Sequence, residues 1–407
     1  TLPATAQEVG RDQAHRFPSF KHQNGMAVFT DFLKAEYTFT YDAQDAETQV
    51  QSEIEFDLAE DGYPVFDLVA EPSVVILDGA SAQAALFKTP DEATTLRVLS
   101  RAVPAGRHHL SIRSPLTRLN SALNGFFMDD SVERFFLERY VPASFEYDHV
   151  KIIFNVSFKN FKTPWKIYAN GNQTRNSDQS VRVEFPEYLT CSGLYFHALP
   201  ADFVKETRFG FKSSSGKLIP VVTYVEPNQT SVAVSAAEVT EDLQKLESLY
   251  GPFPHESLTL YFGRAHVDHF NDMEYSGASI TTGASLYHEL SHSYFARGVM
   301  PANGNANWID EAIADWTEGN LQTTTDLPAR AKLASLPEYA RYCWNIREAY
   351  GMSSFLGNLN GRYKIRGFLK YWGQVRFGQS VTTEEFIQDM EAYTGASLKR
   401  EFEQRVY

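Results

Sequence analysis

The stretch His288-Glu289-Leu290-Ser291-His292 constrains this chain more than any other part of its sequence. Two histidines four residues apart lie about one helical turn from each other, so both imidazoles project from the same face of a helix and can bind one ion. Glu289 lies between them, where its carboxylate can take a proton from a metal-activated water. An H-E-x-x-H sequence on a helix is typical of a catalytic zinc site.

A second segment can supply a third ligand. Glu311 follows His292 after a gap of eighteen residues, within a stretch whose apolar residues have helical spacing. His288, His292 and Glu311 are therefore expected to hold one Zn²⁺ and to leave the fourth position open, as in catalytic sites. Asp315 lies one turn beyond Glu311. It either accepts the free ring N–H of a ligating histidine or is a solvated helix carboxylate.

Four stretches together resemble the gluzincin metallopeptidases, and in particular the aminopeptidase N and leukotriene hydrolase family. Residues 287–319 are similar to the family's H-E-x-x-H-x-W-F and W-L-N-E motifs, with Trp308-Ile-Asp-Glu311 in the second place. Residues 249–262 resemble the segment that leads into the substrate-edge strand, and 381–402 resemble the helical end of the catalytic domain. Asp272-Met-Glu-Tyr275 is similar to G-x-M-E-N, but Tyr275 replaces Asn. The related glycyl aminopeptidase branch also relaxes this motif, so both branches stay open.

The resemblance implies two substrate-binding glutamates. In the family, the glutamate that matches Glu274 binds the free α-amino group of a peptide, because a carboxylate is a charge-assisted partner for an ammonium. The alternative is a strand carboxylate that faces solvent. Glu133 lies nine residues before Pro142, the spacing of the family's second amine-binding residue, and has a structural role as its alternative.

The resemblance also implies a tyrosine that stabilises the oxyanion of the tetrahedral intermediate. Tyr350-Gly-Met-Ser353 is the best match to the family's Y-x-x-G, with serine in place of glycine. Tyr339, Tyr342 and Tyr363 compete for this role, and packing is the alternative for Tyr350 itself.

The composition argues against two classes of binding partner. A net charge of −14 argues against nucleic acid and anionic membrane surfaces, and no apolar run is long enough to span a bilayer. The chain begins with Thr1 rather than Met, which indicates a processed or trimmed N-terminus and leaves the location open. An exported location, periplasmic or secreted, is expected over the cytoplasm. The oligomeric state does not follow from the sequence.

The expected fold class is α+β. β-branched and aromatic runs predict strands at 37–41, 53–58, 150–158 and 181–185, whereas a helical pattern begins near 235 with strands only near 258–262 and 279–282. We therefore expect an antiparallel β-rich domain at 1–206. The resemblance implies a thermolysin-like, mainly helical zinc-peptidase domain at 207–407, and we expect no large C-terminal helical domain.

These features predict a zinc metallopeptidase that removes N-terminal residues from peptide substrates. An endopeptidase or oligopeptidase with an open cleft is the alternative within the class, and a non-catalytic peptide-binding protein on a peptidase scaffold is the alternative outside it. The intact Glu289 argues against the latter.

Overall fold

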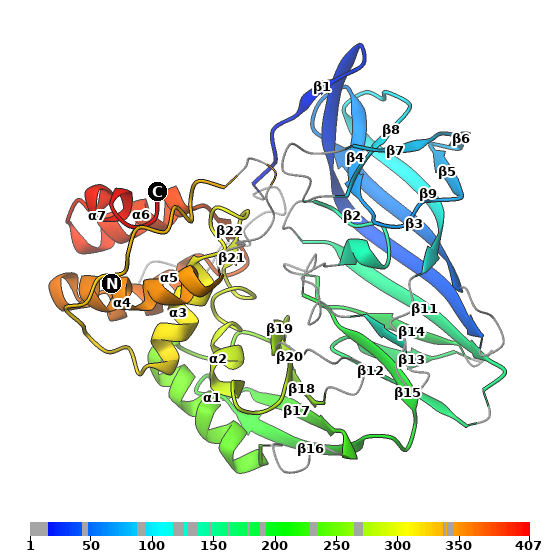
Figure 1. Ribbon diagram of the computed structural model, residues 1–407. Coiled ribbons are helices and arrows are strands. Elements are labelled where there is room, and N and C mark those ends of the chain that lie inside the picture. Colours follow the sequence, from blue (N-terminus) through cyan, green and yellow to red (C-terminus); the bar gives the residue numbers. More distant parts are fainter. Residues whose placement is uncertain are drawn as a thin grey trace.

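The computed structural model describes residues 15–407 except 43–47, 88–94, 117–125, 129–136, 146–148, 162, 177–179, 188–192, 228–233, 264–271, 337–338 and 340–345. The fold is α+β: sheets form one side of the molecule and helices form the other (Figure 1). No helix in the described part has the length and apolar character needed to cross a lipid bilayer.

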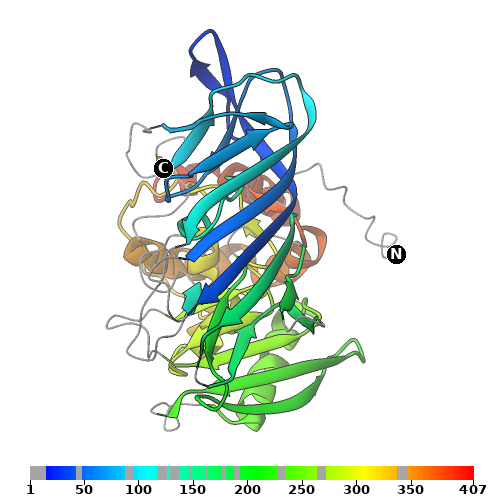
Figure 2. The same cartoon turned by 90° about the vertical axis from the view of Figure 1, so that its right-hand side faces the viewer.

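A large sheet dominates the first part of the chain, and Figure 2 shows it from its outer side. Its described strands are β1 (Phe20–His22), β2 (Gly25–Asp42), β3 (Thr48–Leu58), β4 (Tyr63–Asp67), β5 (Val74–Leu77), β6 (Ala80–Ser81), β7 (Ala84–Leu86), β8 (Leu96–Leu99), β9 (Gly106–Leu116), β11 (Lys151–Lys159), β13 (Asn172–Arg175) and β14 (Val181–Glu184). The main path runs β13-β14-β11-β2-β3-β9-β5-β6, with β2 and β11 parallel. All four strands predicted in this region are confirmed.

The alternation of buried and exposed side chains explains why these segments form strands. Along β3 every second side chain is buried, from Thr48 through Ile54 to Leu58, and the residues between them are more exposed. A period of two places one set of side chains in the core and the other toward solvent. β2 and β11 also pair in parallel, so the sheet is mixed rather than purely antiparallel as expected.

Two smaller sheets follow. β10 (Phe126–Met128), β15 (Phe196–Pro200) and β12 (Trp165–Ala169) form a three-stranded sheet. β16 (Lys205–Lys212), β17 (Leu218–Val225), β18 (Leu258–Phe262), β20 (Ala278–Thr281) and β19 (Met273–Tyr275) form a five-stranded sheet in that order. The strands predicted at 258–262 and 279–282 are β18 and β20. β19 was not predicted as a strand from hydrophobic pattern, and it lies at the edge of the sheet beside β20.

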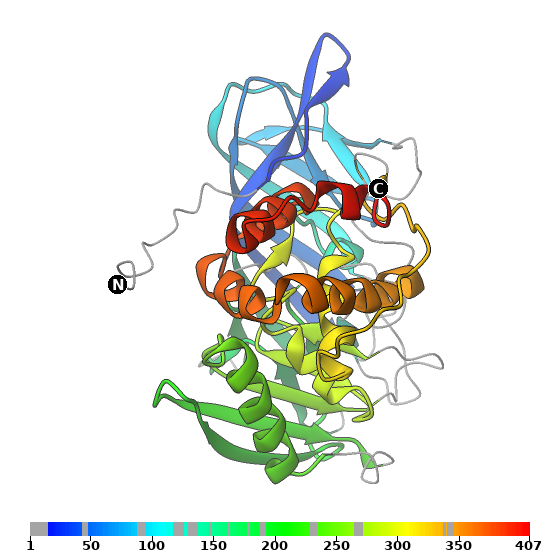
Figure 3. The same cartoon turned by 90° about the vertical axis from the view of Figure 1, so that its left-hand side faces the viewer.

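The helices lie on the side away from the large sheet (Figure 3). They are α1 (Ala236–Tyr250), α2 (Leu286–Ser291), α3 (Ile309–Glu318), α4 (Ile346–Tyr363), α5 (Arg366–Val375), α6 (Thr383–Thr394) and α7 (Lys399–Glu403), with a short 3₁₀ turn at Leu137–Arg139. The two-residue strands β21 (Met300–Pro301) and β22 (Ser380–Val381) pair in parallel between them. The second part of the chain therefore combines a five-stranded sheet with helices.

The five-stranded sheet packs on both faces. Leu243 and Leu246 of α1 share a buried core with Val221 and Leu260 of the sheet. On the other face, Tyr261 lies in a second cluster with Tyr168 of the three-stranded sheet. Burial on both faces fixes the position of the sheet, and the edge strand β19 is thereby held next to α2 and α3.

Candidate metal centre

The two histidines of the H-E-x-x-H stretch face each other, His288 from within α2 and His292 from the residue that caps its C-terminus. Nε2 of His288 lies 3.2 Å from Nε2 of His292, and both side chains are buried. Glu311 approaches from α3, with Oε2 3.4 Å from Nε2 of His288 and 3.6 Å from Nε2 of His292. One ligand atom of each residue lies within 4.8 Å of the others. The structure therefore brings together the three residues expected as zinc ligands.

Packing of α3 explains how Glu311 reaches this position. Ile309, Ala312, Ile313 and Trp316 are buried in the helical core, as their spacing of three and four residues requires. Trp308, just before the helix, is fully buried and donates its indole N–H to Oγ1 of Thr383 at 3.1 Å. Since one face of α3 is locked into the core, Glu311 is directed toward α2.

The residues present fit a divalent cation. Imidazole nitrogens and a carboxylate oxygen are the usual ligands of catalytic zinc. Oε2 of Glu289 is buried and has no hydrogen-bond partner among the described residues, which leaves this oxygen available to a group bound at the centre. Burial raises the pKa of Glu289, and the charge of Glu274 raises it further.

The local field is negative. Burial lowers the pKa of His288, but hydrogen bonds to Glu311 and Glu318 outweigh that effect and raise it to about 11. For His292, burial again lowers the pKa, but the charges of Glu274 and Glu311 raise it to about 9. A field that favours positive charge on both rings would equally favour a bound cation.

The Nδ1 atoms of His288 and His292 have partners other than Asp315, the residue expected from the sequence. Nδ1 of His292 lies 3.1 Å from the carbonyl oxygen of Phe295, and Nδ1 of His288 lies 3.5 Å from a carboxylate oxygen of Glu318. Among the described residues, these partners take the place of Asp315 at both ring nitrogens. The prediction for Asp315 is therefore corrected: Glu318, one turn further along α3, takes that position.

Tyr350 lies beside the centre. It is on α4, and its ring meets that of His288 edge-on, with centroids 5.9 Å apart. Two of its competitors are engaged elsewhere: the hydroxyl of Tyr339 donates to the carbonyl of Pro18, and that of Tyr363 to Glu401. Tyr342 lies outside the described residues.

Glu274 projects from the edge strand β19. Its side chain is 13% exposed, and a carboxylate oxygen of Glu274 belongs to a second close group with His292 and Asp310. It forms an ion pair with Arg297, which the sequence analysis missed together with Asp310 and Glu318. Glu133, the other expected amine-binding residue, lies outside the described residues.

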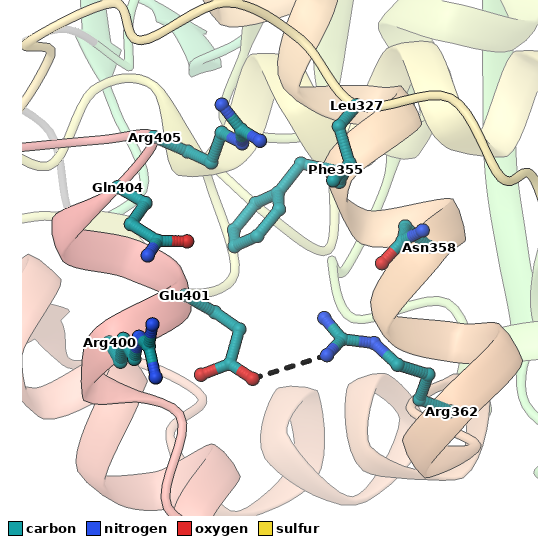
Figure 4. A pocket seen from close by; sticks show the side chains of 8 residues that line it. All are labelled: Leu327, Phe355, Asn358, Arg362, Arg400, Glu401, Gln404 and Arg405. Carbon is teal, nitrogen blue, oxygen red and sulfur yellow. Dashed lines mark hydrogen bonds and ion pairs between the residues drawn. The ribbon is translucent and has the colours of Figure 1, made fainter.

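A pocket of about 400 Å³ lies apart from these residues, between α4 and α7 (Figure 4). Its walls are formed by Leu327, Phe355, Asn358, Arg362, Arg400, Glu401, Gln404 and Arg405. Arg362 and Glu401 form an ion pair across it at 3.2 Å. None of the residues of the metal centre lines this pocket.

The sequence matches no protein-family model and no curated protein. Its structure is similar to a variant of an M1 zinc metallopeptidase from Deinococcus radiodurans bound to a Tyr-Ser-Ala substrate, with TM-score 0.69 and 15% identity over 91% of this chain and 93% of that one. The structure is also similar to Legionella pneumophila aminopeptidase A in complex with aspartic acid, with TM-score 0.70 and 11% identity over 97% of this chain and 51% of that one. Leukotriene A4 hydrolase from Saccharomyces cerevisiae matches with TM-score 0.66 and 12% identity over 92% of this chain and 66% of that one. The chain thus shares the fold of these three proteins.

Proposed function

We propose that this chain is a zinc-dependent metallopeptidase in which His288, His292 and Glu311 hold the ion. The observation that carries the proposal is their convergence, with ligand atoms within 4.8 Å of one another in a buried position beside Glu289. The shared fold supports it, and a neighbour bound to Tyr-Ser-Ala makes a peptide the substrate class we propose.

Each residue has a chemical task. When bound, zinc supplies a Lewis acid that polarises the scissile carbonyl and lowers the pKa of a water molecule. Glu289 takes the proton of the attacking water and passes it to the leaving amine; its buried oxygen, which has no partner among the described residues, supports this role. The hydroxyl of Tyr350 donates a hydrogen bond to the developing oxyanion, in agreement with its place against His288.

Aminopeptidase action is the form of peptidase activity that we favour. Glu274 is a partly exposed carboxylate close to His292, which is where an N-terminal ammonium would lie if the first peptide bond were at the metal. The fold shared with Legionella pneumophila aminopeptidase A supports the same activity.

A second candidate, an endopeptidase or oligopeptidase, is favoured by one specific contact. Nη2 of Arg297 lies 3.1 Å from Oε1 of Glu274, so the carboxylate already has a cationic partner. A neutralised glutamate binds an ammonium more weakly and rejects internal segments of a peptide less strongly.

The metal assignment is tested by zinc analysis of the purified protein. We expect about one zinc per chain, and His292→Ala should lose most of it because one of three ligands is removed. His109→Ala is the matched control, since this histidine is half exposed and pairs with Glu53 on the surface. A full equivalent of zinc in His292→Ala would show that the site is elsewhere.

The catalytic assignment is tested with Glu289→Gln. This variant should retain zinc and lose at least about a hundredfold in kcat, the scale for a removed general base. Glu241→Gln, a substitution on the exposed surface of α1, is the control. Full activity of Glu289→Gln would show that Glu289 is not the general base.

Substrate choice is tested by comparing an aminoacyl fluorogenic amide with its N-acetylated form. An aminopeptidase cleaves the free-amine compound far faster, because acetylation leaves the carboxylate of Glu274 without its ammonium partner. Equal rates on the two compounds would replace the aminopeptidase proposal by the endopeptidase one.

A further inference from the structure

Arg297 ties the edge strand β19 to the segment that follows α2. Its side chain is 4% exposed, and its Nη2 donates both to Oε1 of Glu274 at 3.1 Å and to the backbone oxygen of Glu274 at 3.2 Å. Nη1 donates to the carbonyl of Ala296 at 3.4 Å. A guanidinium that bonds both the side chain and the main chain of one residue fixes its conformation as well as its charge.

Asp310 places a second carboxylate at the same point. It is the second residue of α3, and one of its carboxylate oxygens lies within 4.8 Å of ligand atoms of Glu274 and His292. Oδ1 of Asp310 is buried and has no hydrogen-bond partner among the described residues, although the side chain as a whole is partly exposed. It stands where the similar W-L-N-E motif has an uncharged asparagine.

The charges in this group do not balance. Glu274 and Asp310 carry two negative charges and Arg297 carries one positive charge, so one negative charge is left beside the metal centre. Partly buried carboxylates without enough cationic partners are costly. One monovalent cation, placed between the two carboxylates, would satisfy the group.

We propose that Glu274, Asp310 and Arg297 form one anchor for the N-terminal ammonium group of a peptide, in which Asp310 is the second acceptor and Arg297 is a positioning residue. Arg297 holds Oε1 of Glu274, so the other oxygen of that carboxylate and Oδ1 of Asp310 bind the ammonium. This inference rests on the proposed peptidase function. It adds Asp310 to the substrate-binding residues. Arg297 then orients the carboxylate of Glu274 and does not block it.

The direct test is calorimetric binding of leucinamide and N-acetylleucinamide to the zinc-loaded Glu289→Gln protein, which should bind the amide without cleaving it and serves as the parent for the variants below. We expect leucinamide to bind the parent protein and the acetylated compound to bind at least about tenfold more weakly, the scale of a lost charge-assisted hydrogen bond. Asp310→Asn should weaken leucinamide binding by about tenfold and leave the binding of the acetylated compound in place, so the ratio of the two dissociation constants falls. Asp315→Asn, on the same helix, is the matched control and should keep the parent ratio.

Arg297 is tested by a pair of variants. Arg297→Met should reduce the preference for leucinamide because Glu274 loses its orientation, and Arg297→Lys should restore part of it by returning the charge with one donor group. A general destabilisation would lower the binding of both compounds in both variants and would overturn the positioning role.

Three results would overturn the anchor. The ratio of dissociation constants could be the same in Asp310→Asn as in the parent, Asp310→Asn could lose its zinc, which would assign the carboxylate to the metal, or acetylation could leave binding to the parent unchanged. Failure of the proposed function is distinguishable: a zinc-loaded protein that cleaves neither fluorogenic amide but binds leucinamide through Asp310 keeps the anchor and refutes only the peptidase.

Discussion

The carboxylate of Glu318 lies 3.5 Å from Nδ1 of His288, on the side of the ring opposite Glu311. A hydrogen bond at Nδ1 selects the tautomer whose Nε2 lone pair is free and holds the ring in the direction of the metal. Glu318 therefore completes a chain from the surface of α3 through His288 to the candidate zinc position.

This contact predicts the effect of Glu318→Gln on metal affinity. Loss of the carboxylate should weaken zinc binding by about tenfold, at the low end of the range for outer carboxylates because the side chain is half exposed. Competition with a chromophoric chelator measures the affinity. Asp315→Asn should leave it unchanged, and the reverse order of the two variants would reinstate Asp315 as the residue that orients His288.

The choice between these acids could have been made from helix geometry. Glu318 follows Glu311 by seven residues, which at 3.6 residues per turn places it within about 20° of the same face, whereas Asp315 is displaced by about 40° to the other side. The sequence did predict His288, His292 and Glu311 as a group, because the H-E-x-x-H spacing identifies the two histidines and the apolar period around Glu311 identifies its helix. It could not predict Arg297, since its contact with Glu274 joins a turn to an edge strand that has no periodicity of its own.

In the fold, too, elements with a visible sequence pattern were predictable and contacts between distant segments were not. Strands β2, β3, β11 and β14 were predictable because burial alternates or remains continuous along each of them. Their order was not, because the parallel pairing of β2 with β11 joins segments that are far apart in the chain. Pairing of this kind is decided by the packing of whole faces and not by local residue preference.

The turn between β19 and β20 should not tolerate a side chain at Gly277. Its φ of +64° is costly for alanine, and an added Cβ would lie 2.6 Å from the carbonyl oxygen of Ser257. We expect Gly277→Ala to lower the free energy of unfolding by about 3 kcal/mol, from backbone strain and overpacking together. Gly395→Ala has a similar φ of +70° but open space around its Cβ, so urea denaturation should give a loss of only about 1 kcal/mol. Equal losses would mean that the turn relaxes freely.

Asn170 connects the N-terminal sheets to the turn that follows Glu274. Its Nδ2 donates to the carbonyls of Gly193 at 2.7 Å and Ser276 at 3.0 Å, and its Oδ1 accepts from the backbone N–H of Tyr195. Asn170→Ala leaves these buried groups without partners and should cost about 2–4 kcal/mol in urea denaturation. Gln173→Ala removes an amide of similar chemistry from an exposed position and should cost less than about 0.5 kcal/mol. Similar costs for the two variants would contradict this role of Asn170.

His255 should make the protein sensitive to mild acid. Its ring is buried and its Nε2 lies 3.0 Å from the carbonyl oxygen of Ser293, and burial lowers its pKa to about 4 from an ordinary value of 6.5. Above pH 6.5 the ring is neutral in both the folded and the unfolded chain, so stability is at its full value. As the pH falls from 6.5 toward 4, the unfolded chain binds a proton that the folded chain excludes, and this one group should cost about 3 kcal/mol across that interval. His255→Gln keeps a donor for Ser293 but does not titrate. Urea denaturation at a series of pH values should therefore show a shallower loss of stability in the variant, and parallel curves for the two proteins would mean that His255 is protonated without cost in the folded state.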